Sequence, residues 1–183
     1  MRLNRFYTTV GTSCLWGAGG WELTTDTMKM LRSFEQWCLR QIVKLRRKTG
    51  ETYVDFYKRG IRVGRTVRDQ DQIPSLTRRA LMLQHRWAGH LARMPPDCQL
   101  ARVWKWRDRA TWNSVQGKMF RLDPRNNRAW KHRQGHAAKQ CWGTGLDAVL
   151  GPNWTSTAQN RSSWRKTEGK YIYERLKELG LEK

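Results

Sequence analysis

The pattern of hydrophobic and polar positions is clearest between residues 76 and 94, a stretch that precedes Pro95 and Pro96. Apolar side chains recur there at intervals of three and four residues, which is the spacing of one face of an α-helix. The members of this predicted buried face are Leu76, Ala80, Leu83, Trp87, Leu91 and Met94. Three arginines follow its flank at seven-residue intervals, Arg79, Arg86 and Arg93. This arginine rail is either a solvated helix face or a contact surface for a polyanion.

A second long helix is predicted for residues 24–48, because Thr24, Thr25 and Asp26 offer side-chain acceptors for a helix start. Its expected buried stripe is Leu31, Phe34, Cys38, Ile42 and Leu45. The basic side chains expected on the opposite side, toward the C-terminal end, are Arg40, Lys44, Arg47 and Lys48. A helix C-terminus favours cations, so these four residues either stabilise the helix end or contact nucleic acid.

Residues 51–68 are predicted to form a short helix and then a second piece containing Gly60 and Gly64. If that piece is helical, its three arginines share a face: Arg62, Arg65 and Arg68.

A last helix is expected from Asn153 to about Leu179, with Pro152 at its first turn and Gly169 bending or splitting it. Its stripe is Trp154, Ala158, Trp164, Ile172, Leu176 and Leu179. Arg161 and Glu168 fall inside the stripe, and a buried charge requires a partner from this helix or another element.

Together these patterns predict a mainly α fold, a bundle of about five to seven helices with a basic, partly irregular middle segment. Phe6–Leu15 fits either a strand or a short helix. Composition divides the chain into a lead-in at 1–23, a helical core at 24–96, a basic tryptophan-rich connector at 97–142 and a helical segment at 143–183.

Charge gives the strongest functional indication. The chain of 183 residues carries 36 lysines and arginines against 15 acidic residues, a net charge of +21, together with 11 tryptophans. Nucleic acid is the commonest partner for such a surface, and tryptophan can stack on bases. Residues 98–142 hold eleven of the basic residues and two acidic ones. The candidate phosphate contacts in this region are Arg102, Lys105, Arg107, Arg109, Arg128, Lys131 and Arg133.

Catalytic and cofactor signatures are weak. Two-metal chemistry needs clustered carboxylates, whereas the closest acidic pair is Asp69 and Asp71 in an expected loop. No phosphate-binding glycine loop is present, and no cofactor or catalytic residue is expected. The spacing of His132, His136 and Cys141 offers three zinc ligands, but a structural zinc site needs a fourth, and surface histidines in a basic nucleic-acid-binding segment are the favoured interpretation. His90 borders the apolar stripe of residues 76–94 and is expected to be a structural histidine.

Four blocks resemble segments of LINE-type (non-LTR) retrotransposon reverse transcriptases. Residues 86–94, RWAGHLARM, resemble the R-W-x-G-H-x-x-R-M signature of that family, and residues 15–21, LWGAGGW, are similar to its L-Y-G-x-E-x-W block. That second block departs at Trp16 and Gly19. Residues 30–42 resemble the family's L-x-x-F-E-x-x-C-L-R-x-I helix, and residues 154–168 its W-x3-A-x-D-R-x2-W-x3-E helix, with Asn160 in place of aspartate.

The resemblance implies the thumb and the region after it, without the catalytic palm, and the thumb's family role is to hold a template–primer duplex. The expected function is non-catalytic binding of RNA or an RNA–DNA hybrid through backbone phosphates, in an intracellular, nuclear setting and without a membrane. Two alternatives stay open: a decayed retrotransposon fragment with no activity, and a subunit that completes an RNA-directed DNA polymerase only with a separate palm.

Overall fold

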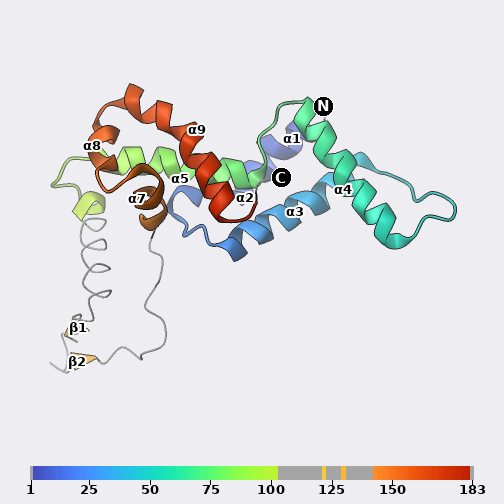
Figure 1. Cartoon of the computed structure of the whole chain (residues 1–183), viewed down its shortest axis with the longest axis horizontal. Coiled ribbons are helices and arrows are strands. Elements are labelled where there is room, and N and C mark those ends of the chain that lie inside the picture. Colours follow the sequence, from blue (N-terminus) through green and yellow to red (C-terminus); the bar gives the residue numbers. More distant parts are fainter. Residues whose placement is uncertain (1, 103–120, 123–128, 131–141, 182–183) are drawn as a thin grey trace. The chain divides into compact units, whose positions relative to one another are not determined.

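The computed structural model describes residues 2–102, 121–122, 129–130 and 142–181. Within them it is mainly helical, with eight α-helices and one 3-10 helix (Figure 1). The predicted mainly α class is confirmed, and the helix number slightly exceeds five to seven because some helices are very short. The chain forms two compact units, Met1–Arg86 with Glu168–Lys183, and Trp87–Thr167.

The N-terminal segment of the first unit is helical, which decides between the two expectations for residues 6–15. Helix α1 spans Arg2–Thr8, α2 spans Val10–Cys14, and the 3-10 helix η1 spans Ala18–Gly20. Gly17 begins the last turn with a φ of 73°, a left-handed conformation that glycine adopts without strain. Leu3, Phe6 and Tyr7 are buried.

Helix α3 spans Thr25–Val43. Of the three residues at the predicted start, Thr24 is the cap, because its hydroxyl oxygen accepts a hydrogen bond from the Thr27 amide at 3.2 Å. The predicted end at residue 48 is wrong, since Lys44 adopts a left-handed conformation with φ 50° and closes the helix. Of the expected stripe, Leu31 and Cys38 are buried, while Met28, Glu35 and Leu39 complete the buried face.

Helix α4 is continuous from Tyr53 to Gln70, so the predicted break near its glycines is wrong. Both glycines face α3 and permit close helix packing. A Cβ atom on Gly64 would lie 2.9 Å from the Leu39 Cβ atom, and one on Gly60 would lie 3.1 Å from Cγ of Arg40. The glycines therefore serve tertiary contact with α3, which outweighs their lower helix propensity.

Helix α5 spans Leu76–Ala92, and its buried face differs from the predicted one. The buried members are Leu76, Thr77, Ala80, Leu81, Gln84, His85, Ala88 and Leu91. Leu83, expected inside, is 37% exposed. The buried face is rotated by roughly 80° from the apolar stripe, counting 100° per residue. Gln84 lies near the centre of this buried face and His85 toward its edge, and neither belongs to the predicted apolar stripe.

The predicted last helix is two helices, α8 at Trp154–Gln159 and α9 at Arg161–Glu178. The break falls at Asn160, whose side-chain oxygen accepts hydrogen bonds from the amides of Ser162 and Ser163 at 2.9 and 3.0 Å. Gly169, expected to bend or split the helix, lies within continuous α9. The predicted stripe is largely confirmed, because Trp154, Ala158, Trp164, Ile172 and Leu179 are buried.

The remaining elements are short. Helix α7 spans Thr144–Leu150, and residues 99–102 are helical. Strands β1 (Arg121–Leu122) and β2 (Ala129–Trp130) pair antiparallel, with Arg121 opposite Trp130. Among the helices in the described ranges, none combines the length and apolar character that crossing a membrane requires.

Candidate nucleic-acid interface

The three arginines of the predicted rail each donate a hydrogen bond within the chain. In the first unit, Arg79 Nη1 lies 2.8 Å from the Tyr7 carbonyl oxygen, and Arg86 Nε lies 2.8 Å from a Glu168 carboxylate oxygen. In the second unit, Arg93 Nη1 donates to the Ala158 carbonyl oxygen at 2.6 Å. Each of these arginines therefore has a structural role, and their contact with phosphate stays a prediction. Arg86 keeps the most freedom, because its side chain is 61% exposed.

The second unit brings two of the family-like blocks together. A Cβ atom on Gly89 would lie 2.3 Å from Nε1 of Trp164, so the glycine makes room for the indole. Trp164 in turn lies against Trp154, with ring centroids 5.6 Å apart. Arg93 donates to Ala158 in the same region. Residues of the signature at 86–94 thus pack on residues of the block at 154–168, which explains their residue types by packing.

A basic loop follows α3. We use this name for residues 44–48, in which the cationic side chains are exposed: Lys44, Arg46, Arg47 and Lys48. Figure 1 shows the segment joining α3 to α4. Among the ion pairs within the described residues, none includes a cation of this loop. Arg46 was missed by sequence reasoning, because helical phase applied beyond Val43 placed it off the chosen face.

Glu51 fixes the backbone after the basic loop. Its carboxylate accepts the Lys48 amide at 2.9 Å and pairs with Arg59 Nε at 2.7 Å. Arg59 also donates to the Arg46 carbonyl oxygen at 2.9 Å. The hydrogen bond from Arg59, followed by the bond from Lys48, lowers the pKa of Glu51 to about 2. One carboxylate therefore holds the loop's backbone while leaving its cationic side chains toward solvent.

Aromatic side chains follow the basic loop in sequence, on the first turns of α4. Tyr53 is 68% exposed, and its ring centroid lies 6.5 Å from that of Tyr57. The guanidinium carbon of Arg40 lies 3.9 Å from the Tyr57 ring centroid. Arg40, predicted to be a phosphate contact, is half-buried between α3 and α4, and its contact with Tyr57 is a cation–π interaction.

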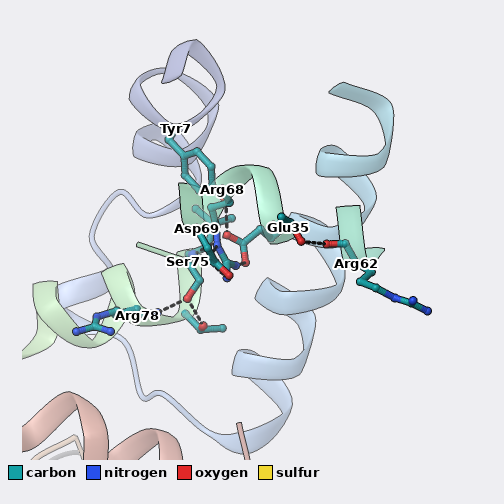
Figure 2. A network of polar contacts seen from close by, with 10 residues as sticks. Tyr7, Glu35, Arg62, Arg68, Asp69, Ser75 and Arg78 are labelled. Atoms are coloured by element: carbon teal, nitrogen blue, oxygen red, sulfur yellow. Dashed lines mark hydrogen bonds and ion pairs between the residues drawn. The ribbon is translucent and has the colours of Figure 1, made fainter. Parts of the chain in front are cut away.

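The buried carboxylate of Glu35 on α3 joins α1, the C-terminal part of α4 and the start of α5 (Figure 2). Glu35 is 2% exposed, accepts a hydrogen bond from the Tyr7 hydroxyl, and accepts the first amide of α5, at Leu76, at 3.1 Å. Arg68 Nη1 lies 3.5 Å from the second carboxylate oxygen. Burial and the adjacent Glu35 charge raise the pKa of Tyr7. The signal for this role was available, because Glu35 falls between Leu31 and Cys38 on the predicted buried stripe.

The arginines predicted to share a face of α4 separate into two groups. Arg65 and Arg68 line a cleft of about 830 Å³, together with side chains from α3 and the start of α5. Arg62 is exposed and points away from this network in Figure 2. The cleft is a second concentration of positive charge, distinct from the basic loop.

Of the two histidines in the described residues, His85 is buried, whereas His90, expected to be structural, is exposed. The His85 ring lies 5.6 Å from the Tyr171 ring, and Tyr171 donates to Gln84 at 2.7 Å. Burial lowers the pKa of His85 to about 4, while the neighbouring Glu168 acts in the opposite direction. His85 is therefore neutral in the folded protein at pH 7.

The remaining predicted site residues are only partly described. Arg102 is exposed at the end of the helical turn at 99–102. The other basic candidates of the middle segment and the three zinc candidates lie outside the described residues: Lys105, Arg107, Arg109, Arg128, Lys131, Arg133, His132, His136 and Cys141. In the ranges that the structure describes, no group of three or more histidine, cysteine, aspartate or glutamate side chains could hold a metal ion.

Comparisons with known proteins add no relative. No protein-family model, no curated protein and no solved structure matches this chain.

Proposed function

We propose that this protein binds nucleic acid through backbone phosphates and has no catalytic activity of its own. The observation that carries the proposal is the basic loop, where four exposed cations have no ion pair within the described residues. The net charge of +21 supports it, because a surface of this charge attracts polyanions over long distances. The exposed ring of Tyr53, which follows the loop in sequence at the start of α4, adds a surface on which an unpaired base can stack.

Salt dependence tests this function. Fluorescence anisotropy of the full chain with a labelled RNA should give an affinity that falls by orders of magnitude between about 50 and 200 mM KCl, because bound phosphates release counterions. Affinity that is independent of salt over that range contradicts backbone binding.

A charge-matched pair of variants locates the interface. Changing Lys44, Arg46 and Lys48 to glutamine removes three charges without breaking a side-chain hydrogen bond that the structure shows. For single-stranded RNA, the salt slope should fall by roughly 0.7 for each phosphate that the variant no longer neutralises. The control changes Lys166, Lys170 and Lys177, which lie on α9, to glutamine as well. Equal effects of the two triple variants indicate a general charge effect and contradict a specific role for the loop.

The resemblance to LINE-type reverse transcriptases supports a narrower proposal, that the ligand is RNA or an RNA–DNA hybrid in the manner of a polymerase thumb. Support comes from the contact of Gly89 with Trp164, which joins two of the four resembling blocks. RNA, hybrid and DNA duplexes of one sequence, titrated at one salt concentration, test it. Tighter binding of DNA duplex than of hybrid contradicts the thumb assignment.

A further inference from the structure

The cleft on the first unit is lined by four arginines and two carboxylates, so its lining is net positive. The arginines are Arg32 from α3, Arg65 and Arg68 from α4, and Arg78 from α5. Its volume of about 830 Å³ falls within the range of about 300–1,000 Å³ that is typical of small-molecule sites.

Two of these arginines converge on one acceptor. With the Gln36 carboxamide oxygen turned toward them, it accepts hydrogen bonds from Arg65 Nη2 at 2.7 Å and from Arg32 Nε at 3.3 Å. Each guanidinium carries five N–H donors, so both retain donors for a second acceptor. The arrangement therefore holds two guanidinium groups, from different helices, around an oxygen atom at the cleft.

The charges of these two arginines are not neutralised by a direct ion pair. Arg68 pairs with Asp69 at 2.8 Å and approaches Glu35 at 3.5 Å, whereas no carboxylate of the described residues lies within ion-pair distance of Arg32 or Arg65. Burial, and then the neighbouring charges of Arg32 and Arg68, lower the pKa of Arg65. Crowding of like charges is unfavourable unless an anion is bound, and paired guanidinium groups suit the tetrahedral oxygens of phosphate.

We propose that this cleft is a phosphate subsite in which Arg32 and Arg65 together bind one phosphate group of the nucleic acid. The inference rests on the proposed function for the identity of the ligand, and on the cleft alone for its phosphate chemistry. The subsite would give one phosphate a defined binding position, whereas the basic loop offers phosphates only exposed positive charge. Phosphate at the end of a strand and phosphate within a strand share this chemistry.

The test uses the full chain and a control on the same helix. Arg65→Gln and Arg62→Gln remove the same charge from α4, but Arg62 is exposed, does not line the cleft, and points away from the polar network of Glu35 (Figure 2). Melting temperature is measured with inorganic phosphate and with chloride at equal ionic strength. Phosphate should raise it for the wild type and for R62Q but not for R65Q. In anisotropy titrations R65Q should bind RNA about tenfold more weakly, the loss expected for one charged hydrogen-bonding group, and R62Q less than about twofold more weakly.

The outcomes separate this inference from the proposed function. No difference between phosphate and chloride for the wild type, or equal RNA affinities of R65Q and R62Q, overturns the subsite while salt-dependent RNA binding still stands. Phosphate stabilisation without RNA binding at low salt overturns the proposed function and, with it, nucleic acid as the source of the phosphate. If circular dichroism shows R65Q unfolded, Arg65→Lys replaces it. That variant keeps the charge but loses the fork of donors, and an undiminished response to phosphate overturns the proposal.

RNAs with 5′-phosphate and 5′-hydroxyl ends distinguish the two phosphate positions. Tighter binding of the phosphorylated RNA by the wild type, abolished in R65Q, assigns the subsite to a strand end. Equal binding of both RNAs by the wild type, with weaker binding of both by R65Q, assigns it to an internal phosphate.

Discussion

The close approach of Gly89 to Trp164 gives the sharpest test of the packing. Gly89→Ala adds one methyl group that would lie 2.3 Å from Nε1 and 2.5 Å from Cδ1 of an indole that is 4% exposed. Overpacking of this kind costs about 1–3 kcal/mol, whereas alanine gains about 0.5–1 kcal/mol over glycine in a helix. We therefore expect a net destabilisation of about 1–2 kcal/mol.

Gly169→Ala is the matched control, because Gly169 lies inside α9 and a Cβ atom there would meet nothing within 4 Å. The same substitution should stabilise the protein by about 0.5–1 kcal/mol. Thermal unfolding followed by circular dichroism measures both. For a chain of this length the two variants should differ by roughly 5–10 °C in melting temperature, at about 2–4 °C per kcal/mol. Equal or parallel shifts of G89A and G169A would refute the close approach of Gly89 to Trp164.

Three further predictions concern buried and hydrogen-bonded side chains. The pKa of His85 is about 4 in the folded protein, against an ordinary value of 6.5. Between these pH values the unfolded chain therefore binds more protons than the folded protein. The free energy of unfolding should fall by about 3 kcal/mol as the pH drops from 6.5 to 4. Denaturant unfolding at a series of pH values measures this decrease. The decrease should be absent in His85→Gln and present in the control His90→Gln. An equal decrease in both variants contradicts the role of His85. Arg79→Gln removes a charged hydrogen bond to a carbonyl and should cost about 1.5–3 kcal/mol. Breaking the exposed pair of Arg86 in Arg86→Gln should cost less than about 1 kcal/mol, and an unchanged RNA salt slope in that variant would limit the rail to a structural role.

The sequence by itself determined the fold class and several element boundaries, since these depend on local chemistry. The start of α3 falls among Thr24, Thr25 and Asp26 as predicted, and Thr24 is its cap, because a hydroxyl at that position satisfies a free amide wherever the helix packs. Trp154, Ala158 and Trp164 are buried as predicted, because apolar side chains are removed from water even though the chain breaks at Asn160 between α8 and α9. The net charge and the basic run after Val43 likewise required no tertiary information.

Only the tertiary structure decided which polar residues are buried and which cations are bonded. The buried face of α5 centres on Gln84, which accepts a hydrogen bond from the Tyr171 hydroxyl and donates one to the Trp21 carbonyl oxygen. Both partners lie outside α5, so the hydropathy pattern of α5 could not predict that Gln84 is buried. Gly60 lies inside one helix because α3 packs against it, although its type suggested an interruption.

The arginines also show the difference between what the sequence predicts and what the tertiary structure decides. Spacing at seven residues favoured Arg79, Arg86 and Arg93 as one exposed row, yet each has an acceptor supplied by a distant part of the chain. Arg32 and Arg65, which no local pattern brings together, meet at Gln36 because α3 and α4 pack side by side. The amino-acid composition determines how much charge a chain carries, whereas long-range packing decides which of those charges are left for a ligand.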